Sequence, residues 1–270
     1  MIGNTFINTP LAIEQSYLMA LIPTLLSEYA LAQRTMSISA EEKEQKYLST
    51  IQAMNTRAEG AMYPVVISIV GPIMKYSSWA CLGTSFYIDL LKSLDSNPQV
   101  LGIILNIDSG GGMVSGTAEL TDTIKNLSKP TIAYTSGYMC SAALDIASGC
   151  DHIMASPYAD LIGSIGTMLS YADYQAMLEK WGAKFYELYA PQSTEKNKEW
   201  RELMKGNEAL YTERLEELAQ SFIDRMKENF GEKLTDDGKV FKGKTYTPKQ
   251  ALEIGLIDQL GSIEDAMNLL

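Results

Sequence analysis

The amino-acid sequence predicts an α/β fold with a largely parallel sheet and helical extensions at its N- and C-terminal ends. Buried-strand patterns alternate with helical patterns between residues 64 and 135, and successive β-α-β units joined by right-handed crossovers give parallel strands. The chain has 270 residues, of which 46% are hydrophobic, so it can bury a full core. We expect a helical N-terminal arm over 1–60 and one domain over 61–270.

The N-terminal arm is predicted from helical spacing of apolar residues. Leu18, Leu21 and Leu25 recur at this spacing, and a charged run of alternating sign follows over 41–46. The next elements are expected as a strand at 64–70, a helix at 84–93, a strand at 100–107, a helix at 118–127 and a strand at 131–135.

The second half of the chain predicts further short elements. In order, these are a strand at 151–155, a turn at 163–168 that leads into another strand, a helix at 171–181, a strand at 184–189, a polar loop at 191–198, a long amphipathic helix at 207–230 and two short helices near 247–255 and 262–270. Met177, Trp181 and Tyr186 are expected in the core. The apolar face of the long helix is the best candidate for contacts between subunits, with packing on its own domain as the alternative.

Composition excludes several classes of protein. A formal charge of −11 and a pI near 4.7 argue against a nucleic-acid-binding surface, which needs clustered Lys and Arg. Three cysteines without C-x-x-C spacing predict neither a disulfide framework nor a zinc site. The N-terminus does not read as a secretion signal, and the apolar stretch at 17–26 is shorter than the about 20 residues that span a bilayer. We expect a cytoplasmic protein without a membrane span, metal or cofactor.

A glycine-rich turn and a serine about thirty residues later carry the candidate chemistry. Gly110, Gly111 and Gly112 follow a strand, so their backbone N–H groups can point at a developing negative charge. Ser141 precedes alanines at the start of an apolar helix, where the helix dipole and a further N–H favour an anion. Together they predict an oxyanion hole and its nucleophile. Taken singly, the serine could be a helix N-cap and the glycines a tight turn.

Two neighbouring residues offer alternatives to this assignment. Cys140 could attack if a base lowered its pKa, but a small buried hydrophobe is the better interpretation. His152 is the sole histidine and lies in an apolar strand, which favours a core or edge residue over a catalytic base.

Several spaced motifs resemble the signal-peptide-peptidase-A serine peptidases, in particular the phage-encoded capsid-assembly (prohead) proteases. Residues 106–112 are similar to the strand ending in N/D-S-P-G-G of that family, with Gly110 in the place of proline. Ser141 lies at the position of the family's serine, although alanines follow it where the family has glycines. Residues 151–157, 163–166 and 247–258 also match family segments, so the resemblance covers roughly 64–267.

The resemblance implies a Clp/crotonase-like fold and a Ser/Lys dyad. The family's lysine lies about fifty residues after the serine, which selects Lys196 as general base and Lys198 as the alternative. Ser164 would orient the lysine, and the N–H groups of Gly112 and Ala142 would form the oxyanion hole. A lysine in water has a pKa of about 10.4, so a base near neutral pH needs a buried amine.

The resemblance also implies a function and partners. The expected activity is a serine endopeptidase that cleaves scaffold or capsid proteins, and its own chain, during phage head assembly, as a homo-oligomer in the host cytoplasm or procapsid. A cellular protease of the same family is one alternative. A crotonase-type acyl-CoA enzyme would share the glycine oxyanion hole, but nothing in the chain marks a CoA site. A catalytically silent assembly protein of the same fold is the remaining alternative.

Overall fold

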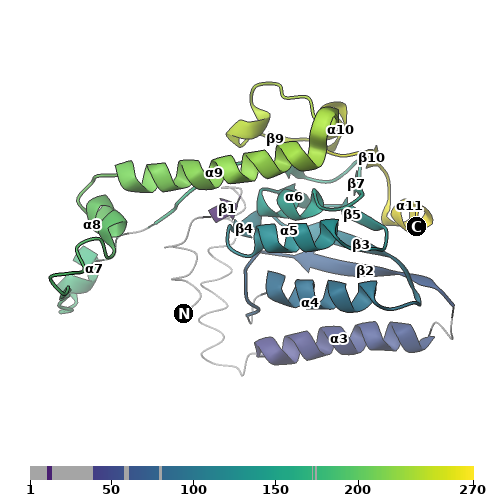
Figure 1. Cartoon of the computed structure of the whole chain (residues 1–270), viewed down its shortest axis with the longest axis horizontal. Coiled ribbons are helices and arrows are strands. Elements are labelled where there is room, and N and C mark those ends of the chain that lie inside the picture. Colours follow the sequence, from purple (N-terminus) through teal and green to yellow (C-terminus); the bar gives the residue numbers. More distant parts are fainter. Residues whose placement is uncertain (1–10, 14–38, 58–60, 79–80, 172, 174) are drawn as a thin grey trace.

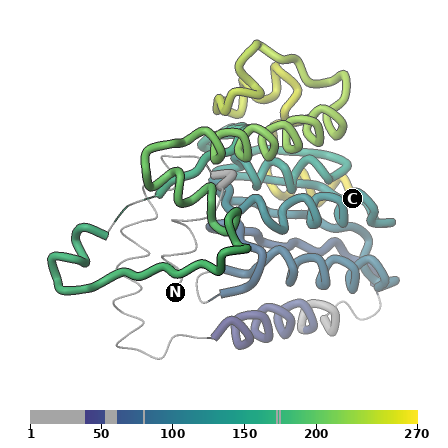
Figure 2. Tube along the Cα trace, turned by 60° about the vertical axis from the view of Figure 1, so that its left-hand side comes forward, coloured from purple at the N-terminus to yellow at the C-terminus, as the bar shows by residue number. Residues whose placement is uncertain are grey.

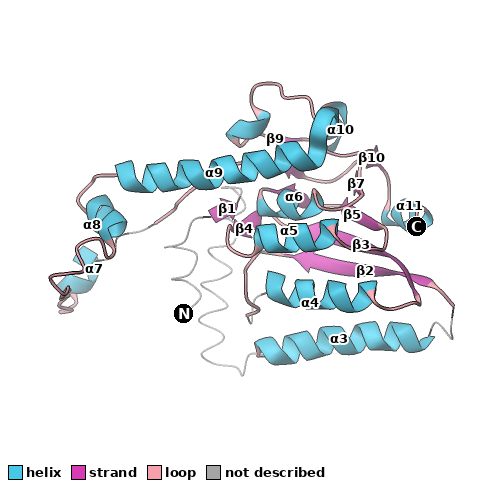
Figure 3. Ribbon diagram, in the orientation of Figure 1, coloured by secondary structure: helices cyan, strands magenta, loops and turns pink. Residues whose placement is uncertain are grey.

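A five-stranded parallel sheet forms the centre of the molecule (Figures 1 and 3). The computed structural model describes residues 11–13, 39–57, 61–78, 81–171, 173 and 175–270. The sheet has the strand order β10-β7-β5-β3-β2, and every neighbouring pair is parallel. Its strands are β2 (Tyr63–Val70), β3 (Val100–Asp108), β5 (Thr131–Thr135), β7 (His152–Ala155) and β10 (Gln259–Leu260). The predicted largely parallel α/β fold is confirmed.

Helices cover both faces of this sheet. Those of the described residues are α3 (Ala40–Arg57), α4 (Thr84–Asp95), α5 (Thr117–Lys125), α6 (Ala142–Ala147), α7 (Gln175–Lys180), α8 (Lys198–Met204), α9 (Ala209–Phe230), α10 (Pro248–Glu253) and α11 (Ile263–Asn268), with short 3-10 turns at Gly231–Lys233 and Val240–Lys242. Helices α4, α5 and α6 lie side by side along one face, α3 lies beside α4, and α9 runs over α6 (Figures 1 and 2). None of these described helices has both the length and the apolar composition that a membrane crossing requires.

Strand β3 shows how the sheet divides the core in two. Successive side chains of a strand point to opposite faces. Ile103 and Leu105 therefore pack into the main core with α4, α5 and α6, whereas Ile104 joins Met154 and Ala266 of α11 in a smaller cluster on the other face. A strand buried on both faces reads as a continuous apolar run, which is why the sequence revealed β3 so clearly.

Two smaller sheets sit beside the central one. Strand β8 (Leu161–Gly163) pairs in parallel with β6 (Tyr138–Cys140) and antiparallel with β9 (Thr245–Tyr246). Strand β4 (Gly111–Met113) pairs antiparallel with β1 (Leu11–Ile13). Each is two or three residues long, too short for a period of two to show in the sequence, and none of these five strands was predicted.

The N-terminal arm is helical only in part. Helix α3 covers the charged run, as predicted, but Leu11–Ile13 form a strand where a helix was expected. The reason is long-range, because these residues pair with the glycine strand β4. The helical spacing at residues 18–29 lies outside the described residues.

Predictions for residues 171–190 were largely wrong. Helix α7 is shorter than expected, and no strand forms at 184–189. The segment around α7 and α8 projects away from the sheet, so a strand there has no neighbour among the described residues to pair with (Figures 1 and 2). Met177, Trp181 and Tyr186, expected in the core, are 41%, 76% and 81% exposed.

Candidate active site

The glycine turn and Ser141 are brought together by a backbone bridge between their neighbours. Ser109 donates its N–H to the Tyr138 carbonyl at 2.8 Å, and its own carbonyl accepts from the Cys140 N–H at 3.1 Å. The next residue on one chain segment is Gly110, and on the other it is Ser141. Gly110 comes just after β3 of the central sheet, and Ser141 follows β6, the short strand that comes next after β5. The site therefore lies at the carboxyl ends of β3 and β5, where open α/β sheets bind ligands.

Ser141 has a backbone conformation that a non-glycine residue rarely adopts. It joins β6 to α6 with φ 57° and ψ −120°. Its side chain is buried, and its hydroxyl Oγ has no hydrogen-bond partner among the described residues. A positive φ costs conformational free energy in any residue other than glycine, and burial of a hydroxyl without a hydrogen-bond partner adds a further cost in free energy. A role in packing or helix capping alone explains neither feature. The Ser141 side chain in fact makes no capping hydrogen bond.

Ser164 also has a positive φ and lies beside Ser141. The Ser141 N–H donates to the carbonyl of Gly163 at 2.7 Å, and Ser164 follows with φ 58°. The Ser164 N–H is held in turn by the carbonyl of Lys244 at 2.9 Å. Asn197 is the third non-glycine residue with positive φ in the described part of the chain, but it lies in the left-handed region, which asparagine tolerates better than other residues. Strain of this kind gathers at functional sites.

Close backbone packing explains the glycine at position 112. A Cβ added to Gly112 would lie 2.0 Å from the Ile73 carbonyl oxygen, so a larger residue cannot fit without moving a strand. Ile73 donates to the Gly111 carbonyl and accepts from the Met113 N–H, at 3.0 and 2.9 Å. Because successive residues of a strand direct their N–H and C=O groups to opposite edges, those of Gly112 face away from Ile73.

The second expected oxyanion donor is the N–H of Ala142. Ala142 is the first residue of α6, and the first N–H groups of a helix have no partner within it. Sequence reasoning missed the role of Ser109, whose hydroxyl accepts the Gly111 N–H at 3.1 Å and fixes the turn. The sequence signal for this role was the position of Ser109 directly after the apolar run that forms β3.

The lysines are not at this site. Lys196 lies in a turn within the projecting segment and is exposed, with its N–H bonded to the Ser193 carbonyl at 3.2 Å. Lys198 forms an ion pair of 2.7 Å with Glu195. This pairing lowers the pKa of the Glu195 carboxyl. The structure therefore brings Ser141, Ser164 and the glycine turn together but leaves both candidate bases outside.

Cys140 and His152 are both directed elsewhere. The Cys140 Sγ donates to the carbonyl of Leu161 at 3.3 Å and is buried, as expected for a small core residue. His152 begins β7, at the opposite end of the strands from Ser141, and its Nδ1 lies 3.7 Å from Asp258 Oδ2. Neither side chain contacts the Ser141 hydroxyl, which has no partner among the described residues.

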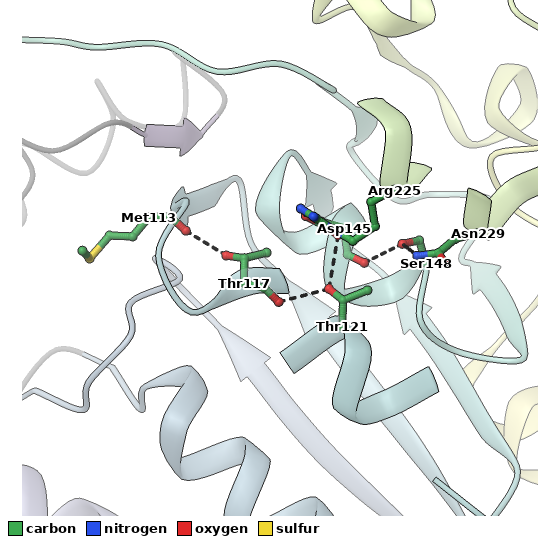
Figure 4. A network of polar contacts seen from close by, with 7 residues as sticks. All are labelled: Met113, Thr117, Thr121, Asp145, Ser148, Arg225 and Asn229. Atoms are coloured by element: carbon green, nitrogen blue, oxygen red, sulfur yellow. Dashed lines mark hydrogen bonds and ion pairs between the residues drawn. The ribbon is translucent and has the colours of Figure 1, made fainter. Parts of the chain in front are cut away.

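A buried ion pair holds the helix that follows Ser141 (Figure 4). Asp145 is one turn along α6, and its N–H donates to the Ser141 carbonyl at 3.0 Å. Its carboxylate accepts from Arg225 of α9 and, at 3.2 Å, from the Thr121 hydroxyl of α5. Ser148 donates to the Asp145 carbonyl at 2.6 Å. The network ties α5, α6 and α9 together next to the candidate nucleophile.

Comparisons with known proteins bear on this arrangement. The family model described as "Peptidase family S49" matches residues 123–270, more than half of the chain. The chain belongs to peptidase family S49. A Clp protease model also matches residues 80–162, and the Clp/crotonase-like fold class is confirmed.

The individual proteins that the chain resembles are distantly related to it. A putative protease of Methanocaldococcus jannaschii is 26% identical over 68% of this chain and 60% of its own length. Capsid assembly protease C of Escherichia phage lambda is 26% identical over 92% of this chain and 55% of its own length. The chain thus spans little more than half the length of these relatives. A membrane-bound stomatin-specific protease of known structure is 17% identical, with a TM-score of 0.43 over 76% of this chain and 84% of that chain.

Proposed function

We propose that this chain is a serine endopeptidase with Ser141 as nucleophile and Lys196 as general base. The observation that carries the proposal is the conformation of Ser141. A strained serine with a buried, unpartnered hydroxyl lies beside the glycine turn and a second strained serine, Ser164. Membership of peptidase family S49 supports the same reaction class.

The proposed reaction is acyl transfer. The Ser141 oxygen bonds to the carbonyl carbon of the scissile peptide while its proton passes to the Lys196 amine. The Gly112 and Ala142 N–H groups stabilise the oxyanion. Lys196 then gives the proton to the departing amine as the C–N bond breaks. Water hydrolyses the resulting ester and restores the serine, with Ser164 orienting the lysine.

A carboxylate-based reaction of the crotonase type has little support at this site. Asp145 is the carboxylate fully buried near Ser141 in the described part of the chain. Both of its oxygens already bind Arg225, and Thr121 adds a third hydrogen bond. It is therefore committed to holding α6 rather than free to exchange protons with a substrate.

The exposed position of Lys196 gives the proposal a further requirement. An amine acts as a base near neutral pH only when burial disfavours its charged form. Assembly of several copies, or substrate binding, must therefore bring the projecting segment onto a site and cover it. Its exposed apolar side chains, which include Trp181, Tyr186 and Leu188, support burial against another copy of the chain.

Phage head assembly is the proposed setting. The similarity to capsid assembly protease C covers 92% of this chain, and a head-tail preconnector protein of Enterobacteria phage P21 is 29% identical over 67% of it. We therefore infer scaffold or capsid proteins as substrates, in the host cytoplasm or the procapsid. The archaeal relative supports a cellular protease as the alternative setting.

A fluorophosphonate probe tests the proposal. The probe should add covalently to Ser141 in the assembled wild-type protein, as read by intact mass and peptide mapping. Ser141→Ala should abolish labelling, whereas Ser148→Ala, which removes another buried serine next to α6, should retain it. A folded, assembled protein that never reacts at Ser141 would instead favour the silent assembly protein, a function that the exposed Lys196 also fits.

A further inference from the structure

The N-terminal strand β1 lies along the glycine strand of the candidate site. Residues Leu11–Ile13 pair antiparallel with β4, with Leu11 opposite Met113, Ala12 opposite Gly112 and Ile13 opposite Gly111. More than forty residues of chain separate β1 from the domain that begins near residue 61. The pairing is therefore a long-range contact of the chain with its own site.

The strand register places Ala12 at the edge of β4 that carries the proposed oxyanion donor, the Gly112 N–H. Ile73 occupies one edge, through the Gly111 carbonyl and the Met113 N–H. The Gly112 N–H and carbonyl face the opposite edge, and Ala12 is the residue directly across. The proposed oxyanion donor thus faces the backbone of β1 rather than an open cleft.

Strand β1 also runs in the direction of the substrate segment that would donate its acyl group to the serine. Gly111 is two residues beyond Ser109, whose carbonyl accepts the Cys140 N–H directly before Ser141. Ile13, opposite Gly111, is therefore the end of β1 nearest Ser141, and the chain runs toward the serine from N to C. Ser141 is only 1% exposed in this arrangement, so no outside peptide can reach its hydroxyl.

We infer that Leu11–Ile13 occupy the position of a substrate strand and keep the protease inactive until they are displaced. This inference rests on the proposed function. The substrate is then an extended polypeptide segment that adds an antiparallel strand to β4. Recognition is then largely through the backbone, as in other cases of strand addition.

The energetics suit a reversible block. Three residues provide few ladder hydrogen bonds, each with a small net contribution to stability. Attachment to the same chain nevertheless raises their local concentration to about the millimolar range. Such a segment excludes dilute substrates, and a high local concentration of substrate displaces it.

A proline substitution in the full-length protein tests the block. Ala12→Pro removes the N–H that faces β4, while Ala40→Pro is the matched control, since it introduces proline at the first position of α3, where helices accept it. The rate of fluorophosphonate labelling at Ser141 is the readout. We expect Ala12→Pro to react about tenfold faster than wild type, the effect of losing one or two ladder hydrogen bonds. Ala40→Pro should match wild type.

A peptide competition provides the second measurement. A synthetic peptide with the sequence of residues 8–16 should slow labelling of the Ala12→Pro protein, and the same peptide with proline at the Ala12 position should not. Equal labelling of all three proteins, without an effect of either peptide, would overturn the strand block and leave the proposed function standing. Absence of labelling at Ser141 in all three folded proteins would overturn the proposed function itself.

Discussion

Arg225 of α9 binds both carboxylate oxygens of Asp145 on α6, with its Nε 2.8 Å from Oδ1 and its Nη2 2.5 Å from Oδ2. The Asp145 side chain is 3% exposed and that of Arg225 19%. Burial raises the pKa of the Asp145 carboxyl, and the hydrogen bonds from Arg225 oppose that change. The same bonds raise the pKa of Arg225. The pair thus fixes the helix that begins at Ser141 against the long helix.

Removal of Arg225 should strongly destabilise the protein. Arg225→Met leaves a buried carboxylate without its partner, which costs about 3–5 kcal/mol. Arg214→Met is the matched control, because Arg214 lies on the same helix and forms an exposed pair of 2.9 Å with Glu199. That loss should stay below about 1 kcal/mol. Urea unfolding at pH 7 measures both, and equal losses would contradict a structural role for the buried pair.

The cost of Arg225→Met should shrink in acid. Without Arg225, only the protonated form of Asp145 is tolerated in the core, so its folded-state pKa lies well above the ordinary value of 3.8. A carboxyl with a raised folded-state pKa destabilises the fold as the pH rises from its unfolded-state pKa to its folded-state pKa. The variant should therefore approach wild-type stability near pH 4 and fall behind toward pH 7. A pH-independent difference in the free energy of unfolding would show that charge is not the cause.

Ser141→Ala should abolish peptide hydrolysis without unfolding the protein. The hydroxyl supplies the covalent step and makes no hydrogen bond that the fold needs. Hydrolysis of a labelled protein substrate and thermal unfolding measure the two effects. Full activity in Ser141→Ala, with loss in Cys140→Ala, would transfer the nucleophile to the cysteine.

Lys196→Ala should cost most of the rate, and Lys198→Ala much less. Only one amine can lie within about 3 Å of the serine oxygen, and Lys198 already pairs with Glu195. Measurement of kcat for the two variants shows which substitution lowers the rate more. A larger loss in Lys198→Ala would make Lys198 the base. His152→Ala should leave kcat nearly unchanged, because His152 lies at the other end of the sheet from Ser141.

Activity should depend on assembly. Dilution of the wild-type protein should lower specific activity together with the sedimentation coefficient, since burial of Lys196 requires contacts beyond one chain. Tyr186→Asp in the projecting segment should weaken assembly, whereas Tyr158→Asp, at a comparably exposed tyrosine outside that segment, should not. A monomer with undiminished specific activity would exclude the assembly-dependent site.

The order of the central strands and helices could be predicted from sequence because their signals are local. The apolar run of β3, the glycines after it and the 3.6-residue spacing of α9 each depend on neighbours along the chain. Ser141, Ser164 and Gly112 could also be selected from the sequence, through motif resemblance. The exposed positions of Trp181 and Tyr186 could not be predicted from the sequence. A projecting segment that is rich in apolar residues has the same composition as a segment of the core.

Only the tertiary structure decided how these pieces meet. The bridge from Ser109 to Cys140, the pairing of β1 with β4 and the Asp145–Arg225 ion pair join positions far apart along the chain, 80 residues in the last case. Such contacts depend on shape and on which backbone edges remain unpaired, and no local pattern encodes either. Residue types and spacing thus determined the family and the candidate chemistry. Long-range packing determined that Ser141 is strained and buried and that both candidate lysines stand outside the site.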